Sequence, residues 1–343
     1  MNICFVNDRF SRRGGVSRVT TELANSLQEN GNKVSIIDFS GENQFYFNIH
    51  SDIVRHYVIS KRKLKRRIIT KILNLKYSLS KNPLKIIDLY KEQKEDLVRH
   101  LKGNNYDVLI MCQGVLTALV PHIKKEIPNL KIVAWQHNEY EVYVKNYHKK
   151  YINDYLLGIK SSDLVVCLTK EDQEKFSKLN KNSTCIYNPL TITNVEKHIS
   201  NLNNKNIIFV GRLLIEQKGL DFLLEVGKRI NNDWSILVAG DGADKQKFNH
   251  MIRENKLEKR ILLTGMLDNK GLIELYKNGS IFISTSRWEG FGLVVTEAMS
   301  FGLPIISFET RGPKEILENG KHGILIEQNN ISEFCKKVNY LID

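Results

Sequence analysis

The sequence predicts an α/β protein built from two Rossmann-like domains. An apolar strand followed by a glycine loop and an amphipathic helix opens the chain, and a similar pattern begins again near residue 206. In both halves, short apolar runs alternate with helical patterns, as a parallel sheet covered by helices requires. The chain has 343 residues, 42% of them hydrophobic, so it has room for two domains with buried cores.

The first half begins as a βαβ unit. An apolar strand at 3–6 leads to Arg12-Arg13-Gly14-Gly15, an amphipathic helix from 16 to about 29, and a strand at 34–39. The loop lacks the Gly-x-Gly-x-x-Gly pattern, so an NAD site has little support. The paired glycines, Gly14 and Gly15, form either a tight turn or a loop that faces a ligand.

A strongly basic segment follows an irregular insertion. Residues 61–87 contain ten Lys or Arg and no acid. If the segment is helical, five apolar residues form a stripe flanked by positive charge: Leu64, Ile68, Ile72, Leu75 and Leu79. Such a helix either lies on an anionic membrane surface or packs on its domain with a solvated basic face. We favour the membrane.

Three more apolar strands are predicted at 108–112, 132–135 and 164–168. His137 comes just after the second of these, where open α/β sheets keep their binding crevice. It is either a structural hydrogen-bonding group or part of a site. Tyrosines then recur at helical spacing, which indicates one half-buried helix face or an acceptor surface: Tyr140, Tyr143, Tyr147, Tyr151 and Tyr155.

The domain boundary is predicted from composition. The asparagine-rich stretch 191–205 reads as a linker between an N-terminal domain at 1–190 and a C-terminal domain at 206–343. The second domain restarts with the strand at 206–210. Arg212 and Lys218 lie on either side of the loop after this strand, where they either bind a diphosphate by charge-assisted hydrogen bonds or are simply solvated at the surface.

The most informative stretch is 281–299. It predicts a strand, a break at Glu289-Gly290-Phe291-Gly292, and a helix that carries Glu297 two turns after Glu289. A helix start offers unpaired N–H groups, and glycines let a ligand approach the backbone. Two carboxylates there accept hydrogen bonds from sugar hydroxyls, unless they are only a solvent-facing charge and an ordinary helical Glu.

This Glu-x7-Glu pattern around Gly-Phe-Gly-Leu, followed by Glu-Ala-Met-Ser-Phe-Gly-Leu-Pro, resembles the retaining nucleotide-sugar glycosyltransferases of family 4. Gly-Arg-x5-Lys-Gly at 211–219 agrees with the same family. The resemblance is densest from 207 to 326. It implies the GT-B fold, in which two Rossmann-like domains face each other across a cleft, with the acceptor on the N-terminal domain and the nucleotide sugar on the C-terminal one. The implied reaction is retaining transfer of a hexose or N-acetylhexosamine, with UDP favoured over GDP as the nucleotide.

The resemblance also implies site residues. Glu289 and His137 are the catalytic candidates, with His137 near the donor sugar. The implied donor-binding residues are Gly15, Arg212, Lys218, Met266, Glu289, Gly290, Phe291, Gly292, Leu293 and Glu297. Among them, Glu297 would hold the ribose, Glu289 and the neighbouring amides the hexose, and the backbone at Met266 the nucleobase.

No metal or other cofactor is expected. The sequence contains no Asp-x-Asp and no His, Cys and Asp cluster at ligand spacing. Arg212, Lys218 and the dipole of the helix that begins near Gly292 would neutralise the departing diphosphate in place of a cation.

Charge points to the acceptor. The net charge is +13, and it is uneven: residues 1–190 contain 31 Lys and Arg against 19 acids, whereas residues 191–343 contain 20 against 19. A basic N-terminal half fits a glycan on a lipid diphosphate at the inner membrane face, as in capsule or lipopolysaccharide synthesis. Five scattered cysteines and a start that already reads as a strand favour the cytoplasm, with peripheral membrane contact.

Two other classes of protein are weaker alternatives. A nucleotide-sugar epimerase of similar architecture would need no acceptor, but the Glu-x7-Glu match argues against it. A nucleic-acid-binding protein is suggested only by the high isoelectric point, about 9.3. No recognition motif accompanies the charge, so no nucleic-acid partner is expected.

Overall fold

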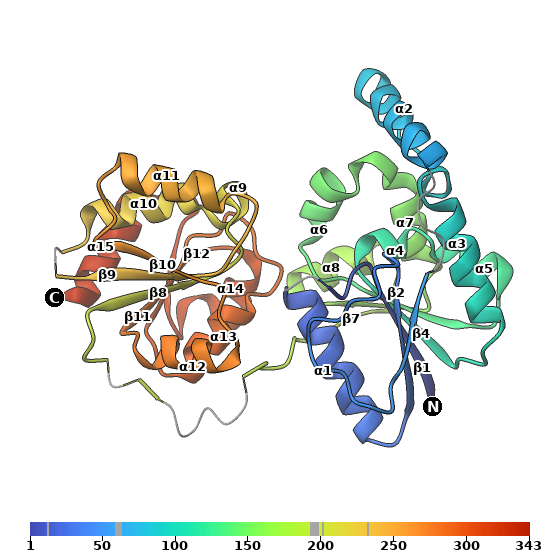
Figure 1. The fold of residues 1–343 in the computed structure, drawn as a ribbon, viewed down its shortest axis with the longest axis horizontal. Helices are drawn as coiled ribbons and strands as arrows, with labels where there is room; N and C mark the ends of the chain where they lie inside the picture. Colours follow the sequence, from blue (N-terminus) through green and yellow to red (C-terminus); the bar gives the residue numbers. More distant parts are fainter. Residues whose placement is uncertain (12–13, 59–63, 193–198, 201, 232) are drawn as a thin grey trace. The chain divides into compact units, whose positions relative to one another are not determined.

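The computed structural model describes residues 1–11, 14–58, 64–192, 199–200, 202–231 and 233–343 (Figure 1). The chain divides into two compact units, Met1–Asn188 and Pro189–Asp343. Each unit contains one parallel sheet, which confirms the two Rossmann-like domains. Arg12, Arg13, the start of the basic segment at 61–63 and part of the predicted linker, 193–198 and 201, lie outside the described residues.

The first unit is built on seven parallel strands in the order β3-β2-β1-β4-β5-β6-β7. The strands are β1 (Asn2–Asn7), β2 (Lys33–Asp38), β3 (Val54–Tyr57), β4 (Val108–Cys112), β5 (Lys131–Trp135), β6 (Leu164–Cys167) and β7 (Ser183–Cys185). The sequence predicted the five central strands but not β3, where it indicated an irregular insertion. This edge strand is short, and most of its residues are exposed, so it carries no apolar run.

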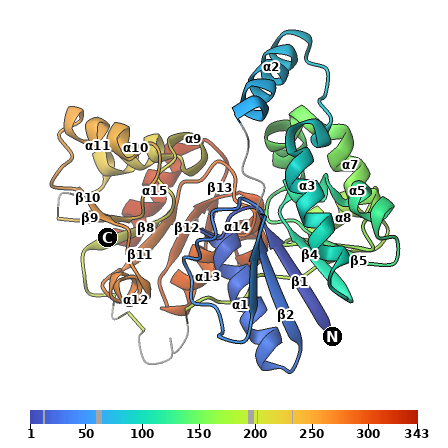
Figure 2. The ribbon, with the colours of Figure 1, turned by 45° about the vertical axis from the view of Figure 1, so that its right-hand side comes forward.

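The helices of the first unit are α1 (Gly15–Glu29), α2 (Leu64–Ser80), α3 (Ile86–Lys102), α4 (Gly114–Thr117), α5 (Val120–Glu126), α6 (Tyr140–Val142), α7 (Ile152–Ser161) and α8 (Lys170–Ser177). A π-helical turn, η1 (Tyr143–Tyr147), and a 3-10 turn, η2 (Lys149–Tyr151), lie between α6 and α7. Figures 1 and 2 both show α2 projecting from the rest of this unit.

The predicted burial of the tyrosines is confirmed for four of the five, which lie in the core or pack against it, but the single helix that was to carry them is not formed. The segment from Tyr140 to Tyr155 changes from α to π to 3-10 and back to α. Each change alters the number of residues per turn, so residues four apart do not stay on one face. Tyr143 and Tyr155 are buried, whereas Tyr147 is 43% exposed.

The second unit has six parallel strands in the order β10-β9-β8-β11-β12-β13. The strands are β8 (Asn206–Val210), β9 (Ser235–Ala239), β10 (Ile261–Gly265), β11 (Ile281–Ser284), β12 (Ile305–Phe308) and β13 (Ile324–Ile326). The helices are α9 (Ile215–Lys218), α10 (Leu220–Arg229), α11 (Lys245–Glu254), α12 (Asn269–Lys277), α13 (Leu293–Ser300), α14 (Arg311–Ile316) and α15 (Ile331–Ile342), with a 3-10 turn, η4 (Glu318–Gly320).

The core of the second unit lies on both faces of its sheet. Ile281 and Ile283 of β11 belong to one buried cluster, whereas Phe282 between them belongs to another. Because successive side chains of a strand point to opposite faces, both faces must be covered by helices. This explains why the strands read as continuous apolar runs and not as an alternating pattern.

The strand order reverses direction at one place in each sheet. In the first unit, β1 lies between β2 and β4, and in the second unit β8 lies between β9 and β11. At such a reversal, the connections that leave neighbouring strands go to opposite faces of the sheet, which leaves a crevice at the carboxyl ends. The loops after β8 and β11 are therefore the first place to look for a ligand site.

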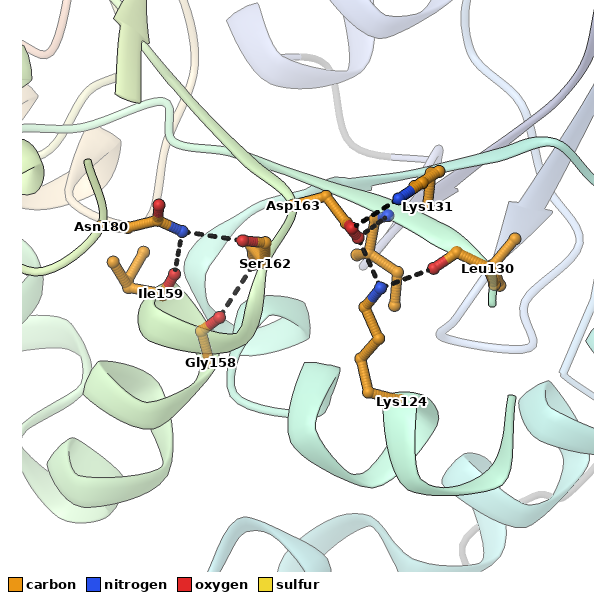
Figure 3. A network of polar contacts seen from close by, with 9 residues as sticks. Lys124, Leu130, Lys131, Gly158, Ile159, Ser162, Asp163 and Asn180 are labelled. Atoms are coloured by element: carbon orange, nitrogen blue, oxygen red, sulfur yellow. Dashed lines mark hydrogen bonds and ion pairs between the residues drawn. The ribbon is translucent and has the colours of Figure 1, made fainter. Parts of the chain in front are cut away.

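A polar network supports the opposite, amino-terminal edge of the first sheet (Figure 3). Asp163 accepts hydrogen bonds from the backbone N–H of Ile132, at 2.8 Å, and from Lys131 Nζ, at 3.4 Å, and forms an ion pair with Lys124. The Asn180 side chain donates to the carbonyl oxygens of Ile159 and Ser162 at the end of α7. These contacts fix strand and helix ends on the side away from the carboxyl ends of the strands.

Candidate donor site

An ion pair joins the loops after β8 and β11. Lys218, the last residue of α9, donates from Nζ to the Glu289 carboxylate. Both side chains are largely shielded from solvent, 11% and 18% exposed. The Lys218 stem passes over Gly211, where an added Cβ would lie 3.4 Å from Lys218 Cε. The structure therefore brings together two of the predicted site residues, from loops 71 residues apart in sequence.

The backbones of the same two loops are locked together. The buried Thr285 hydroxyl donates to the carbonyl oxygen of Lys218 at 2.8 Å. Gly219 follows in the left-handed conformation, with φ of 60°, and a Cβ there would collide with the carbonyl oxygen of Thr285. Only glycine satisfies both the conformation and the close approach. The position of Lys218 is thus fixed by β11 as well as by its own helix.

Arg287 reinforces this lock, and the sequence analysis did not single it out. Its guanidinium makes two hydrogen bonds to Asp221, at 2.9 and 2.5 Å, and donates to the carbonyl oxygens of Ile215 and Glu216. It also lies 4.2 Å from the ring centroid of Phe222. A planar guanidinium suits this set of partners, because it has several donors in a fixed fork and a flat face. Arg287 therefore acts on the site through the loop that it holds.

The glycine-rich turn leads directly into α13. Gly290, Phe291 and Gly292 are buried, and Gly292 has φ of 96° immediately before Leu293, the first residue of the helix. The Gly312 N–H donates to the carbonyl oxygen of Glu289 at 3.1 Å, and a Cβ on Gly312 would collide with Phe291 O. The backbone at Gly312 thus holds the turn in place, so the start of α13 has a fixed position beside Glu289.

Glu297 is buried and lies on α13, the helix that follows this turn. The residue is only 2% exposed. Its two carboxylate oxygens accept hydrogen bonds from the hydroxyls of Thr191, at 2.7 Å, and Tyr276, at 2.9 Å. A buried carboxylate needs such partners. Neither partner could be predicted from local spacing, since Thr191 is 106 residues away and Tyr276 is on α12.

The other two predicted residues of this unit occupy the same edge of the sheet. Arg212 follows β8 and is exposed, and Met266 follows β10 and is 40% exposed. The carboxyl ends of β8, β9 and β10 are in direct contact. The Gly240 N–H donates to Gly265 O at 2.8 Å, and a Cβ on Gly240 would collide with Gly211 O. Both residues therefore belong to the carboxyl edge that also carries Lys218 and Glu289, with β9 separating their strands.

In the first unit, Gly15 and His137 both follow carboxyl ends of strands. Gly15 is the exposed first residue of α1, after β1. His137 follows β5, is 8% exposed, and lies against Trp135 with ring centroids 4.4 Å apart. Its backbone N–H donates to the Tyr143 hydroxyl at 3.0 Å, but neither ring nitrogen has a hydrogen-bond partner among the described residues. Burial lowers the pKa of His137 to about 3, so the ring is neutral near pH 7.

A second buried histidine, His148, escaped the sequence analysis. Its ring stacks on Tyr143 with centroids 4.8 Å apart and an interplanar angle of 12°, and Nδ1 lies 2.9 Å from the Tyr151 hydroxyl. A side chain at Gly114 would collide with Nε2. Burial lowers the pKa of His148 to about 3. The only signal in the sequence was its place among the tyrosines, which is not specific.

The two buried histidines should make folding acid-sensitive. Their pKa values in the folded chain, about 3, lie below the ordinary value of 6.5. As pH falls from about 6.5 toward 3, the unfolded chain binds protons that the folded chain does not, so stability is lost on acidification. Each histidine should contribute a slope of about 1.4 kcal/mol per pH unit in that window.

Urea unfolding at several pH values from 7 to 4 would measure this slope. His148→Gln and His137→Gln should each reduce it, whatever they do to stability at pH 7. As a control, His250→Gln should leave it unchanged, because His250 is an exposed residue of α11. Equal slopes for all four proteins would mean that these histidines do not account for acid sensitivity.

Within the residues that the structure describes, no three His, Cys, Asp or Glu side chains gather as a metal site would need. In the same part of the chain, no helix is long and apolar enough to cross a membrane.

The chain thus consists of two parallel-sheet Rossmann-like units, and in the second unit a cation and a carboxylate pair where the sheet reverses its strand order. Residues 13–193 match the sequence profile of Glycosyltransferase Family 4, and residues 191–343 match that of Glycosyl transferases group 1. The chain belongs to glycosyltransferase family 4. It is therefore an enzyme of the glycosyltransferase class with the GT-B fold.

Individual relatives agree along nearly the whole chain. An uncharacterized glycosyltransferase of Haemophilus influenzae is 30% identical over 338 residues, which cover 96% of this chain and 87% of the relative. The lipopolysaccharide 1,6-galactosyltransferase of Salmonella typhimurium is 25% identical over 100% of this chain and 90% of its own. A crystal structure of a TarM variant from S. aureus, in complex with fondaparinux, alpha-GlcNAc-glycerol and UDP, has a TM-score of 0.74 at 16% identity, covering 100% of this chain and 93% of that one.

Proposed function

We propose that this chain is a retaining glycosyltransferase that moves a hexose or N-acetylhexosamine from a UDP-sugar to a glycan or lipid-linked oligosaccharide during synthesis of a bacterial surface polysaccharide. The observation that carries the proposal is the ion pair of Lys218 and Glu289 beside the start of α13, at the point where the sheet reverses its order. A cation, a helix start and a carboxylate in one place match the diphosphate and sugar of a nucleotide sugar.

Each part of the donor has a proposed partner. Lys218 and Arg212 bind the diphosphate by charge-assisted hydrogen bonds, and the dipole of α13 adds to the neutralisation of the leaving group. Glu289 and the amides of Phe291 and Gly292 hold the hexose hydroxyls. Met266 marks the nucleobase end, and Leu293 and Gly290 shape the turn. Gly15 and His137 contribute from the first unit, where His137 is proposed to meet the donor sugar.

In the proposed reaction, the acceptor oxygen attacks the anomeric carbon from the side on which the diphosphate leaves. The new bond to the acceptor forms as the bond to the diphosphate oxygen breaks, and the acceptor proton passes to the diphosphate. Glu289 stabilises the positive charge that develops on the sugar ring and does not form a covalent bond to it. No metal is required in this scheme, because Lys218, Arg212 and α13 carry out the charge neutralisation.

The acceptor and the cellular setting are proposed from charge and from relatives. The N-terminal half carries nearly all of the net positive charge, which fits a lipid diphosphate. Two similar proteins support this setting by their names, the lipopolysaccharide 1,6-galactosyltransferase of Salmonella typhimurium and an amylovoran biosynthesis glycosyltransferase of Erwinia amylovora. We place the enzyme in the cytoplasm, peripheral to the inner membrane, with an anionic membrane surface as a partner of the segment 61–87.

A donor screen tests the proposal. The purified protein is mixed with UDP-, GDP-, ADP- and dTDP-sugars, with and without EDTA, while thermal stabilisation and slow donor hydrolysis are measured. We expect one UDP-sugar to stabilise the protein and to be hydrolysed equally with EDTA present. Loss of both signals with EDTA would contradict metal independence. An epimerised sugar in the absence of acceptor would favour the epimerase, which the comparisons do not support.

Glu297 allows the ribose contact to be separated from a purely structural role. Glu297→Ala should weaken binding of UDP and of the UDP-sugar by about tenfold, because a ribose hydroxyl loses its acceptor. Tyr276→Phe removes one buried partner of Glu297 and keeps the carboxylate. It should lower stability but leave the affinity for UDP within about twofold. Titration calorimetry with UDP measures both, and equal weakening by the two variants would mean that Glu297 only supports the fold.

A further inference from the structure

We propose that α2 docks this enzyme on an anionic lipid bilayer, with four exposed apolar side chains entering the headgroup region. These are Ile68, Ile72, Leu75 and Leu79, which we call the outer stripe. The inference rests on the proposed function in one respect, namely that the membrane is where the enzyme binds its lipid-linked acceptor. The docking itself is argued from α2 and its neighbours, and its test uses no donor.

The outer stripe is more exposed than apolar side chains of a folded chain usually are. Its members are 53%, 60%, 63% and 80% exposed, in chain order. At about 100° per residue, they fall within an arc of about 60° on one side of the helix. Single exposed apolar residues need no explanation, but a continuous row of four marks an interaction surface.

The opposite side of α2 is the one that meets the protein. Tyr77, half a turn away from the outer stripe, is 8% exposed. Asn74 accepts a hydrogen bond from Lys150 Nζ at 2.8 Å, and the chain just after α2 is held by the Leu84 N–H, which donates to Lys150 O at 2.6 Å. With this side fixed, the outer stripe faces away from its own unit. The alternative of a helix with its apolar face packed inward does not hold for the described residues.

Charge selects the partner. Lys71 and Lys76 are exposed and lie about 60° to 80° from the centre of the outer stripe, one on each side. Long lysine side chains in these positions reach the level of lipid phosphates while the stripe enters the bilayer. The exposed Lys145 and Lys149 come from η1 and η2, next to the contact between Lys150 and α2.

A second copy of this chain is a poorer occupant. Pairing two outer stripes would place the flanking lysines of both helices against each other, and residues 61–87 offer no acid to compensate them. Like charges at such flanking positions are repulsive. Nucleic acid would use the charge but leave the apolar row unexplained. An anionic bilayer accounts for both features. With 17 residues and a basic flank, α2 would lie along the membrane surface.

Vesicle flotation of the full chain tests the proposal. Vesicles of phosphatidylcholine alone are compared with vesicles in which part of the lipid is phosphatidylglycerol. We expect binding to the anionic vesicles, and a loss of about tenfold or more for the triple variant I72S/L75S/L79S. Tyr340→Ser is the matched control, because Tyr340 is a 72% exposed apolar residue on α15 of the other unit. Triple-variant binding equal to that of the original chain would overturn the proposal.

Two further variants show how the helix binds. K71Q/K76Q keeps the outer stripe and should weaken the preference for anionic lipid by about tenfold or more, because each lysine near the surface contributes about 1 kcal/mol. Leu75→Trp should give a blue-shifted fluorescence on anionic vesicles only. If the chain ignores vesicles and the triple variant instead converts a dimer to a monomer in light scattering, the outer stripe is a self-association surface and the proposal fails. Donor hydrolysis is measured on the same proteins: flotation without hydrolysis would sink the proposed function alone, and hydrolysis without flotation would sink the docking alone.

Discussion

Replacing Lys218 by alanine should weaken donor binding by about a hundredfold, which corresponds to about 2.7 kcal/mol. Lys218 is the shielded cation at the reversal of the second sheet, and its loss removes charge-assisted hydrogen bonds to the diphosphate. It also removes the Lys218 partner of the Glu289 carboxylate, so the incoming diphosphate meets a carboxylate that Lys218 no longer neutralises. Calorimetric titration with UDP and with the UDP-sugar measures the effect.

The control for this substitution is Lys228→Ala. Lys228 also pairs with a carboxylate, Glu225, at 2.7 Å, but near the end of α10 and in an exposed position. It should change donor affinity by less than about twofold, as exposed ion pairs contribute little. Lys218→Arg should restore only part of the affinity, because the larger guanidinium must fit over Gly211. Unaltered UDP affinity in Lys218→Ala would remove Lys218 from the donor site.

Replacing Glu289 by glutamine should lower kcat by about a hundredfold to a thousandfold, with a much smaller change in donor affinity. The amide keeps the size and the hydrogen-bonding reach of the side chain but not its negative charge. Because the negative charge stabilises the positively charged sugar ring of the transition state more than the bound donor, its loss lowers kcat more than donor affinity. Initial rates of transfer, or of donor hydrolysis if the acceptor is not at hand, give kcat and KM for both proteins.

Glu225→Gln serves as the matched control for Glu289→Gln. It neutralises the carboxylate that pairs with Lys228 and Arg229 on α10, away from the candidate site, and should leave kcat within about twofold. Thermal unfolding of both variants checks that the fold is kept. A kcat for Glu289→Gln close to that of the original chain would show that the carboxylate only positions Lys218.

Much of the fold could be predicted from the sequence, because parallel strands buried on both faces consist of consecutive apolar residues. The strands at 108–112, 206–210 and 281–284 lie where those runs occur. The helix start at Leu293 follows the glycine turn as predicted. β3 could not be predicted, because an exposed edge strand has no apolar run. The change from α to π to 3-10 at Tyr143–Tyr151 could not be predicted either, because the tyrosine spacing continues through it without a break.

In the candidate site too, some features could be predicted from local sequence and others depend on tertiary structure. Lys218 and Glu289 could be proposed from local motifs, but their pairing depends on which strands are neighbours in the sheet. Arg287 gave no signal, because its partners, two backbone carbonyl oxygens and the Asp221 carboxylate, lie 66 to 72 residues earlier in the chain. Thr191 and Tyr276 also meet Glu297 only through the fold. Long-range partners of this kind are set by tertiary structure and not by local spacing.

The contact between Gly219 and Thr285 has a consequence for how this enzyme can vary. Because the backbone at Gly219 touches the loop after β11 and the Thr285 hydroxyl caps Lys218, the chain from Gly211 to Gly219 has a fixed length. An inserted residue there would move Lys218 by about 3 Å or more, beyond hydrogen-bond reach of the same partner. We expect changes in sugar or acceptor preference among related chains to arise by insertion elsewhere, with these two loops conserved in length as a single rigid part.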